Sequence, residues 1–191
     1  MAIMNAIDVA NYFLTHQEKA ANEERITHLK IQKLCYYAQG FALVELQRPL
    51  FPDPIVHWQH GPVVLSLWDR FKGYGYTPLP IPKTYMDYES LDCEVRILFE
   101  RVNSQYGNVT AWLLRNMTHA EPPWSNTAWG EEISHQKMFS HFSVVVNARR
   151  EITKKFSMDT AFKEMTDSGL DEVKAGKFSS LDEVRRQIAS L

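Results

Sequence analysis

Residues 27–47 contain the pattern that most constrains the fold of this chain. Apolar side chains recur there every three or four positions, which predicts a long helix with an apolar stripe. Thr27 precedes the pattern and suits the N-cap, where its hydroxyl would accept a backbone N–H. The apolar positions are Ile31, Leu34, Cys35, Ala38, Phe41 and Ala42. The helix is expected to end near Gln47.

Most of the remaining patterns are also helical. Residues 6–14 form an amphipathic stripe behind Asn5, a second N-cap candidate. Further helices are expected from Pro62 to Gly73, from about Ser90 to Gly107, over about residues 109–115, and behind Ser134. Residues 55–59 differ, because they are β-prone and bounded by turn residues. The predicted fold class is mainly α, with a short extended segment or small β element near residues 55–60 and a helical C-terminal tail.

The C-terminal part divides into a connector and a tail. Residues 1–143 are expected to form the main domain and residues 144–157 a basic helical connector with Arg149, Arg150, Lys154 and Lys155. In the tail, residues 158–191, a helical pattern runs from 158 to 174, Gly176 interrupts it, and Ser180 with Glu183 forms a capping box for a last helix. The tail has too few apolar residues to fold alone, so it must dock on something.

The charge and the hydropathy of the sequence restrict the classes of partner that this chain is expected to bind. With 21 basic and 23 acidic residues the formal net charge is −2, so no global positive field attracts the chain to nucleic acid. No run approaches the ~20 consecutive apolar residues of a membrane helix, and the first residues lack the pattern of an export signal. Cys35 and Cys93 stand in apolar, helix-like contexts and are expected to be buried, reduced thiols. We therefore expect a cytoplasmic protein without a membrane partner.

Four stretches, taken in order, resemble the Panacea (SocA-like) antitoxin family. They are Val9-Ala10-Asn11-Tyr12-Phe13-Leu14, Leu29-Lys30-Ile31-Gln32-Lys33-Leu34-Cys35-Tyr36-Tyr37-Ala38, Trp58-Gln59-His60-Gly61-Pro62-Val63-Val64 and Thr118-His119-Ala120-Glu121-Pro122-Pro123-Trp124. The resemblance covers Ala6 to about Phe142, which makes residues 1–143 a Panacea domain. Two positions depart from the family pattern: His60 stands where an aromatic residue is more frequent, and Leu65 where a proline is common.

The resemblance implies a function through protein binding. Panacea domains are mostly helical, occur in two-gene toxin–antitoxin pairs of bacteria, often on phage or other mobile elements, and neutralise a cognate toxin by direct contact. The implied partner is therefore a toxin protein. The implied antitoxin is not an enzyme and carries no cofactor.

Catalytic and metal-binding patterns are weak. His57, His60, His119 and Glu121 could be imagined as a zinc site, but residues three apart on an extended segment point to opposite faces. Ser66 and Cys35 both belong to helices rather than to a tight glycine-flanked turn, so neither resembles a catalytic nucleophile. No catalytic residue and no metal ligand is predicted, and a small metal-dependent hydrolase stays as the least favoured alternative.

Several residues suit partner contact. Lys33 lies on an apolar helix beside Tyr37, so its ammonium is either at a rim, where it could contact a partner, or paired with a buried acid. Of the five tryptophans, Trp68 and Trp112 are assigned to the core by their helical stripes. The other two considered, Trp58 and Trp124, lie in irregular segments and are candidate contacts.

The leading hypothesis is an antitoxin with a toxin-binding groove and a tail that folds on the toxin. The groove residues are Lys33, Tyr37, Trp58, His60, His119 and Trp124, and the tail anchors are Leu170, Phe178 and Val184. The second hypothesis is a DNA-binding autorepressor that uses residues 149–155 and the tail, although residues 170–176 offer little of the strand that a ribbon-helix-helix protein needs. Self-association through the tail also stays open.

Overall fold

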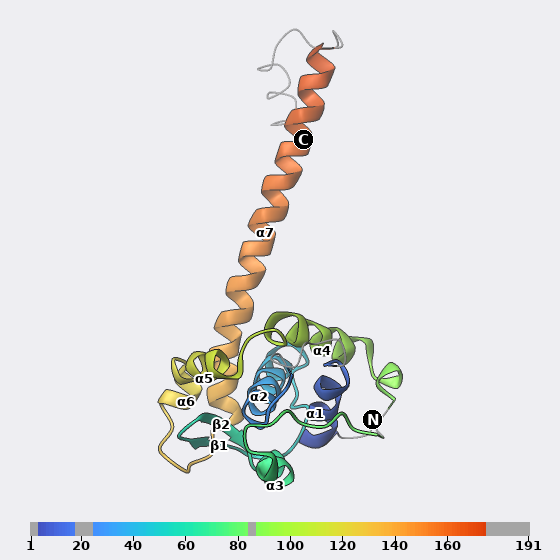
Figure 1. Ribbon diagram of the computed structural model, residues 1–191. Coiled ribbons are helices and arrows are strands. Elements are labelled where there is room, and N and C mark those ends of the chain that lie inside the picture. The colour runs from blue at the N-terminus through green and yellow to red at the C-terminus, as the bar shows by residue number, and fades with distance from the viewer. Residues whose placement is uncertain (1–3, 18–24, 84–86, 175–191) are drawn as a thin grey trace. The chain divides into compact units, whose positions relative to one another are not determined.

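The computed structural model describes residues 4–17, 25–83 and 87–174, with side chains as far as Ser157. The described chain is mainly α-helical with one small sheet, as predicted (Figure 1). Its elements are α1 (Ala6–Thr15), α2 (His28–Glu45), β1 (Ile55–Trp58), β2 (Gly61–Val64), α3 (Leu65–Phe71), η2 (Lys72–Tyr74), η3 (Tyr88–Ser90), α4 (Cys93–Tyr106), α5 (Ala111–His119), α6 (Pro122–Ser125) and α7 (His135–Lys174).

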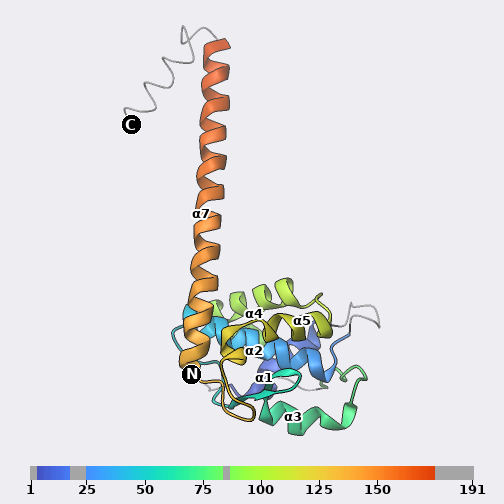
Figure 2. The same cartoon turned by 90° about the vertical axis from the view of Figure 1, so that its left-hand side faces the viewer.

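Helix α2 is the centre of the core, and its predicted cap and length are confirmed. The Thr27 hydroxyl accepts the Lys30 N–H at 3.4 Å, and the helix ends at Glu45. Helices α1, α4 and α5 and strand β2 all contact it (Figure 2). Nearly every residue of α2 is buried, including polar ones, rather than one stripe alone. Buried Gln32 and Gln39 fit because their amide groups bond the backbone of β2 and of residues 50–51.

The predicted β element is confirmed, but it is a hairpin and the helix behind it starts later than expected. Strand β1 pairs antiparallel with β2, from Ile55 opposite Val64 to Trp58 opposite Gly61. The prediction that Pro62 opens a helix is wrong, because α3 begins at Leu65. Pro62 fits in β2 because its partner His57 directs its own N–H and carbonyl to Glu131 and Gly130, so no ladder bond needs a Pro62 N–H.

Helix α7 starts where predicted and continues without a break at the expected end of the connector. The Ser134 hydroxyl accepts the Lys137 N–H at 3.3 Å, and Phe142 on the first turns is buried. Phe142 packs so closely on α2 that a Cβ at Gly40 would overlap its ring. The helix runs through Gly169 to Lys174. The interruption at Gly176 and the capping box lie outside the described residues.

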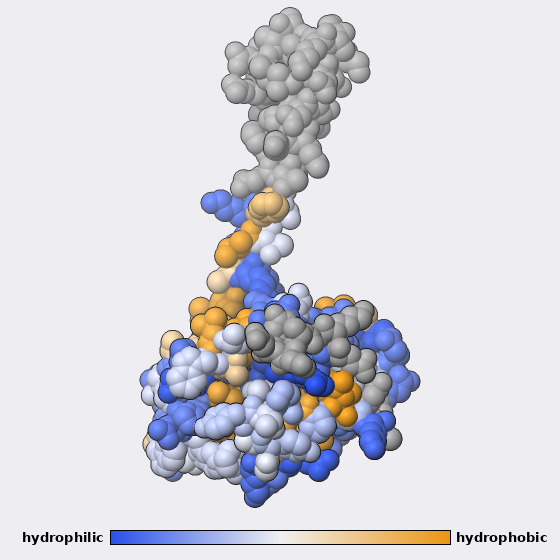
Figure 3. Space-filling model, in the orientation of Figure 1, coloured by the Kyte–Doolittle hydropathy of each residue, from blue (hydrophilic) through white to orange (hydrophobic). Residues whose placement is uncertain are grey.

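The chain divides into two compact units, Met1–Val146 and Asn147–Leu191. The first contains the core and every pocket discussed below. On the face of this unit seen in Figure 3, polar residues predominate and apolar ones form separate patches. Among the described residues, none of the helices combines the length and the apolar composition that a membrane-spanning segment needs.

The two cysteines differ in environment. Cys35 is buried in α2, as predicted, and burial raises the pKa of its thiol. The prediction of a buried Cys93 is wrong, because it is the exposed first residue of α4. The buried stripe of that helix passes through Val95, Leu98, Phe99 and Val102 instead.

Candidate functional site

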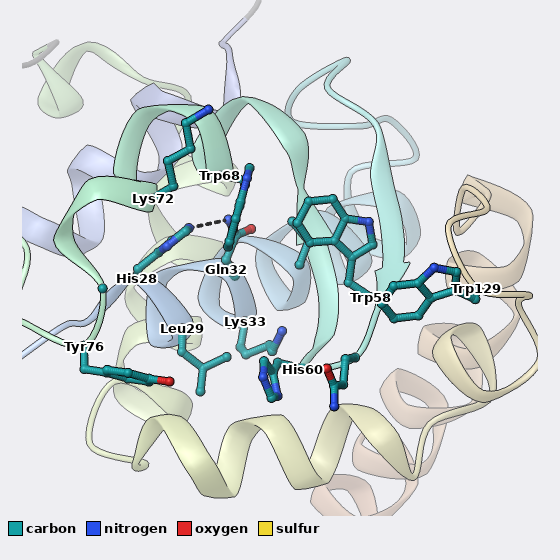
Figure 4. A pocket seen from close by; sticks show the side chains of 13 residues that line it. His28, Leu29, Gln32, Lys33, Trp58, His60, Trp68, Lys72, Tyr76 and Trp129 are labelled. Carbon is teal, nitrogen blue, oxygen red and sulfur yellow. Dashed lines mark hydrogen bonds between the residues drawn. The ribbon is translucent and has the colours of Figure 1, made fainter.

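A pocket of about 430 Å³ opens between α2, the β-hairpin and the segment of α3 and η2 (Figure 4). We call it the aromatic pocket, because indole, phenol and imidazole rings form much of its lining. It is lined by His28, Leu29, Gln32, Lys33, Trp58, Gln59, His60, Val63, Trp68, Lys72, Gly75, Tyr76 and Trp129. The structure thus brings three of the predicted contact residues, Lys33, Trp58 and His60, to one site.

Three aromatic side chains of this lining are exposed, and we call them the aromatic rim: Trp68, Tyr76 and Trp129. Their exposed fractions are 37%, 95% and 67%. The core assignment of Trp68 is therefore wrong, although its ring also packs on Trp58 and His28, with ring centroids 5.0 and 5.1 Å away. Sequence reasoning missed Tyr76 and Trp129, although aromatic residues beside Gly75 and Gly130 in turns were a usable signal for exposed rings.

The core assignment of Trp112 is also wrong. It lies on the outer side of α5 with 58% of its surface exposed, and the Arg115 guanidinium lies 5.0 Å from its ring centroid. The buried residues of α5 are Leu114 and Thr118, which define a different face. Trp112 does not line the aromatic pocket.

Lys33 is fully buried, so its predicted place at a rim is wrong. Its Nζ donates to the Pro62 carbonyl oxygen at 2.8 Å, and no described carboxylate pairs with it, which also contradicts the alternative of a buried acid. Gly61 makes this approach possible, because a Cβ there would lie 2.8 Å from Nζ and its φ of +96° favours glycine. Burial, and then the Arg115 charge, lower the pKa of Lys33 to about 7.

Tyr37 is buried as well, and its hydroxyl is used inside the domain. Tyr36 and Tyr37 donate to the two carboxylate oxygens of Glu121, each at 2.8 Å. The His141 Nε2 lies 3.7 Å from Glu121 Oε2. Burial, and then the Glu121 charge, raise the pKa of both tyrosines. This cluster ties α2 to the turn before α6 and to α7. Its burial leaves Tyr37 almost no surface to offer a partner.

Trp124 forms the centre of a ring stack next to the hairpin. Its centroid lies 3.7 Å from that of His119, with the rings nearly parallel, and 4.2 Å from that of His57. Its Nε1 donates to the Trp58 carbonyl oxygen at 3.1 Å. His119 is half-buried, and burial, followed by the charge of Arg115, lowers its pKa to about 4. His119 and Trp124 thus hold the segment from the end of α5 to α6 against the hairpin. Both lie beside the aromatic pocket and are not part of its lining.

The zinc site considered from the sequence does not assemble. A His57 ring nitrogen lies 2.6 Å from the Thr127 carbonyl oxygen, and Glu121 accepts the tyrosine hydroxyls. Among the described residues, no three histidine, cysteine, aspartate or glutamate side chains are grouped to hold a metal ion.

The tail anchors are only partly described. Leu170 lies in α7, but its side chain is beyond the described ones, and Phe178 and Val184 lie outside the described residues. None of residues 147–157 is buried, and Ile152 and Phe156 are among the exposed large apolar side chains.

Residues 31–125, from α2 to the end of α6, match the family model described as "Antitoxin SocA-like, Panacea domain". The chain carries a Panacea domain. This match confirms the family resemblance found in the sequence, and it covers the hairpin, α3 and Glu121. No curated protein and no solved structure matches the chain. The Panacea family points to an antitoxin whose partner is a toxin and whose role is not enzymatic.

Proposed function

We propose that this Panacea protein is a cytoplasmic antitoxin that neutralises one cognate protein toxin by direct contact, and that the toxin binds over the aromatic rim. The observation that supports the proposal most is the exposure of Trp68, Tyr76 and Trp129 around one pocket. Tryptophan and tyrosine dominate binding energy at protein interfaces, because they bury large areas while losing little side-chain entropy.

Two residues of the rim, Trp68 and Trp129, are also supported from behind. Trp58 packs edge-on against Trp68, and the Trp58 carbonyl accepts the Trp124 indole N–H. The His57 ring lies 6.2 Å from that of Trp129. Anchors that are ordered before binding lose less free energy when a partner covers them.

The proposal is tested by co-expression with the small reading frame encoded next to this gene. The intact chain should restore growth when that neighbour is toxic alone. A Tyr76→Ala/Trp129→Ala variant should lose rescue by tenfold or more in the antitoxin dose required, since each anchor contributes at least about 1–2 kcal/mol. Trp112→Ala is the matched control, because it removes an exposed tryptophan away from the pocket.

Two results would contradict this placement. Full rescue by the double variant would show that the toxin binds elsewhere. Loss of rescue with Trp112→Ala alone would move the contact to α5. A neighbour that is harmless alone, together with no binding partner in a pull-down, would contradict the antitoxin role itself.

We further propose that the C-terminal segment adds a second contact to the toxin. An isolated helix is marginally stable in water unless its apolar side chains pack on something. None of residues 147–157 is fully buried, and the apolar side chain of Ile152 is 71% exposed. A toxin surface that covers them would stabilise the helix.

DNA binding by the same segment is the second candidate function. Arg149, Arg150, Lys154 and Lys155 lie in the stretch of α7 that has no buried residue. A gel shift with the promoter of the gene tests it: binding that weakens steeply with salt supports phosphate contacts. Absence of a shift at low salt, with or without the toxin, would exclude an autorepressor.

A further inference from the structure

The lining of the aromatic pocket contains basic residues and no acidic ones. Lys33, Lys72, His28 and His60 contribute to it, whereas none of its residues is an aspartate or a glutamate. Lys72 is partly neutralised by Asp69 at 2.9 Å on the exposed side. The other basic side chains face the cavity without a carboxylate among them.

Lys33 is the residue that most needs a counter-charge. Its buried Nζ has one acceptor among the described residues, a neutral backbone oxygen, although an ammonium carries three donors. The Arg115 charge on α5 acts on Lys33 and on His119, so it adds to the positive charge near the buried Nζ. A buried ammonium without a carboxylate is costly, and an anion would compensate it.

The rest of the pocket is shaped for a flat apolar body. The Trp58 and Trp68 rings meet edge to face, and the His28 ring lies 5.1 Å from that of Trp68. In Figure 4 the Lys33 side chain extends toward the turn that carries His60, while Trp58 and Trp68 line another side of the cavity. The volume of about 430 Å³ lies within the range of small-molecule pockets.

We propose that the aromatic pocket binds a small aromatic carboxylate, with its ring against Trp58 and Trp68 and its carboxylate toward Lys33 and His60. Because Lys33 is fully buried, contact requires a neighbouring side chain of the lining, such as the exposed His60 on the hairpin turn, to change its position. Exposed side chains change rotamer within nanoseconds, so this opening needs no change of fold. The inference goes beyond toxin binding, since it gives the antitoxin a small-molecule site beneath its proposed toxin surface.

The test uses naphthalene-2-carboxylate as the probe and naphthalene-2-carboxamide as the uncharged control of the same shape. Titration of the full chain is followed by the NMR signals of the tryptophan indole N–H groups. The signals of Trp58, Trp68 and Trp129 should shift, whereas that of Trp112 should not, because Trp112 lies outside the pocket. The carboxylate should bind about tenfold more tightly than the carboxamide, as expected for one charge-assisted hydrogen bond.

Two variants separate the charge from the ring contacts. In Lys33→Met the carboxylate should lose most of its advantage over the carboxamide while the carboxamide affinity changes little. In Trp68→Ala, which removes a partly exposed ring of the pocket and leaves Lys33 in place, both compounds should weaken to a similar degree. Equal affinities in the intact chain, shifts confined to Trp112, or a carboxylate preference that survives in Lys33→Met would overturn the proposal.

Discussion

Replacement of Lys33 by methionine should make the protein more stable at neutral pH. Methionine is also long and unbranched, but it has no charge to bury. Lys33 is fully buried, and its pKa falls from 10.5 to about 7. Because one pKa unit corresponds to about 1.4 kcal/mol, protonated Lys33 costs the folded state roughly 4–5 kcal/mol. Loss of the hydrogen bond to the Pro62 carbonyl offsets about 1–2 kcal/mol. The expected gain at pH 7 is therefore about 2–3 kcal/mol.

The gain should depend on pH in a defined direction. Between pH 7 and 10.5 the unfolded chain holds the Lys33 proton and the folded chain has released it, so the stability of the intact protein rises with pH. Lys33→Met lacks this titration. Its advantage should shrink by about 3 kcal/mol between pH 7 and pH 9.5. Other titrating groups, such as Cys35, are common to both proteins and cancel in the difference.

Urea unfolding at the two pH values measures both quantities. Lys72→Met is the matched control, because Lys72 is exposed and its partner Asp69 is exposed too, so its effect should stay within about 0.5 kcal/mol at either pH. A Lys33→Met protein that is less stable than the intact chain at pH 7 would refute the reasoning. So would an advantage that is equal at both pH values, since it would show that Lys33 is not a buried titrating group.

Three further perturbations test the fold and the tail. Gly40→Ala should lower the free energy of unfolding by about 1–3 kcal/mol or more, because its Cβ would overlap an aromatic ring of α7. Gly73→Ala is the control and should change stability little, because the space around Gly73 is open. Equal effects of the two variants in urea unfolding would disprove the close packing of α7 on α2. Glu121→Gln should cost about 1–3 kcal/mol, since an amide accepts from only one of the two tyrosine hydroxyls, and exposed Glu131→Gln should cost almost nothing in the same assay. Deletion of residues 158–191 should leave the Tm of the free protein nearly unchanged and weaken toxin binding, whereas a large fall in Tm with intact neutralisation would assign the tail to the domain's own packing.

The sequence predicted elements best where local patterns alone decide them. The cap at Thr27 and the helix behind it follow from short-range chemistry, and so does strand β1. The prediction from sequence failed at Pro62, where pairing with His57 in the hairpin overrode the local preference of proline for a helix start. That pairing depends on Glu131, which is far away in the sequence.

The candidate site was harder to predict because burial depends on the whole fold. A lysine among apolar residues is expected to reach a surface with its ammonium, yet the Lys33 ammonium is buried beside Gly61. The close approach of α2 and the hairpin that buries it cannot be recognised from the local sequence. Helical stripes placed Trp68 in the core, although the side of α3 that carries it faces the pocket opening. Glu121 was considered only as a metal-site residue, because two tyrosine donors from α2 meet it only in the folded chain.

Hydrogen–deuterium exchange of the antitoxin, free and in complex with the co-expressed toxin, tests the central claim most directly. If the toxin covers the aromatic rim, exchange should slow in residues 65–76, which carry Trp68 and Tyr76, and in residues 128–133 around Trp129. The outer face of α5 around Trp112 should exchange at the same rate in both states. Slowing confined to α4 or α5, with residues 65–76 unchanged in a complex that forms, would contradict the account.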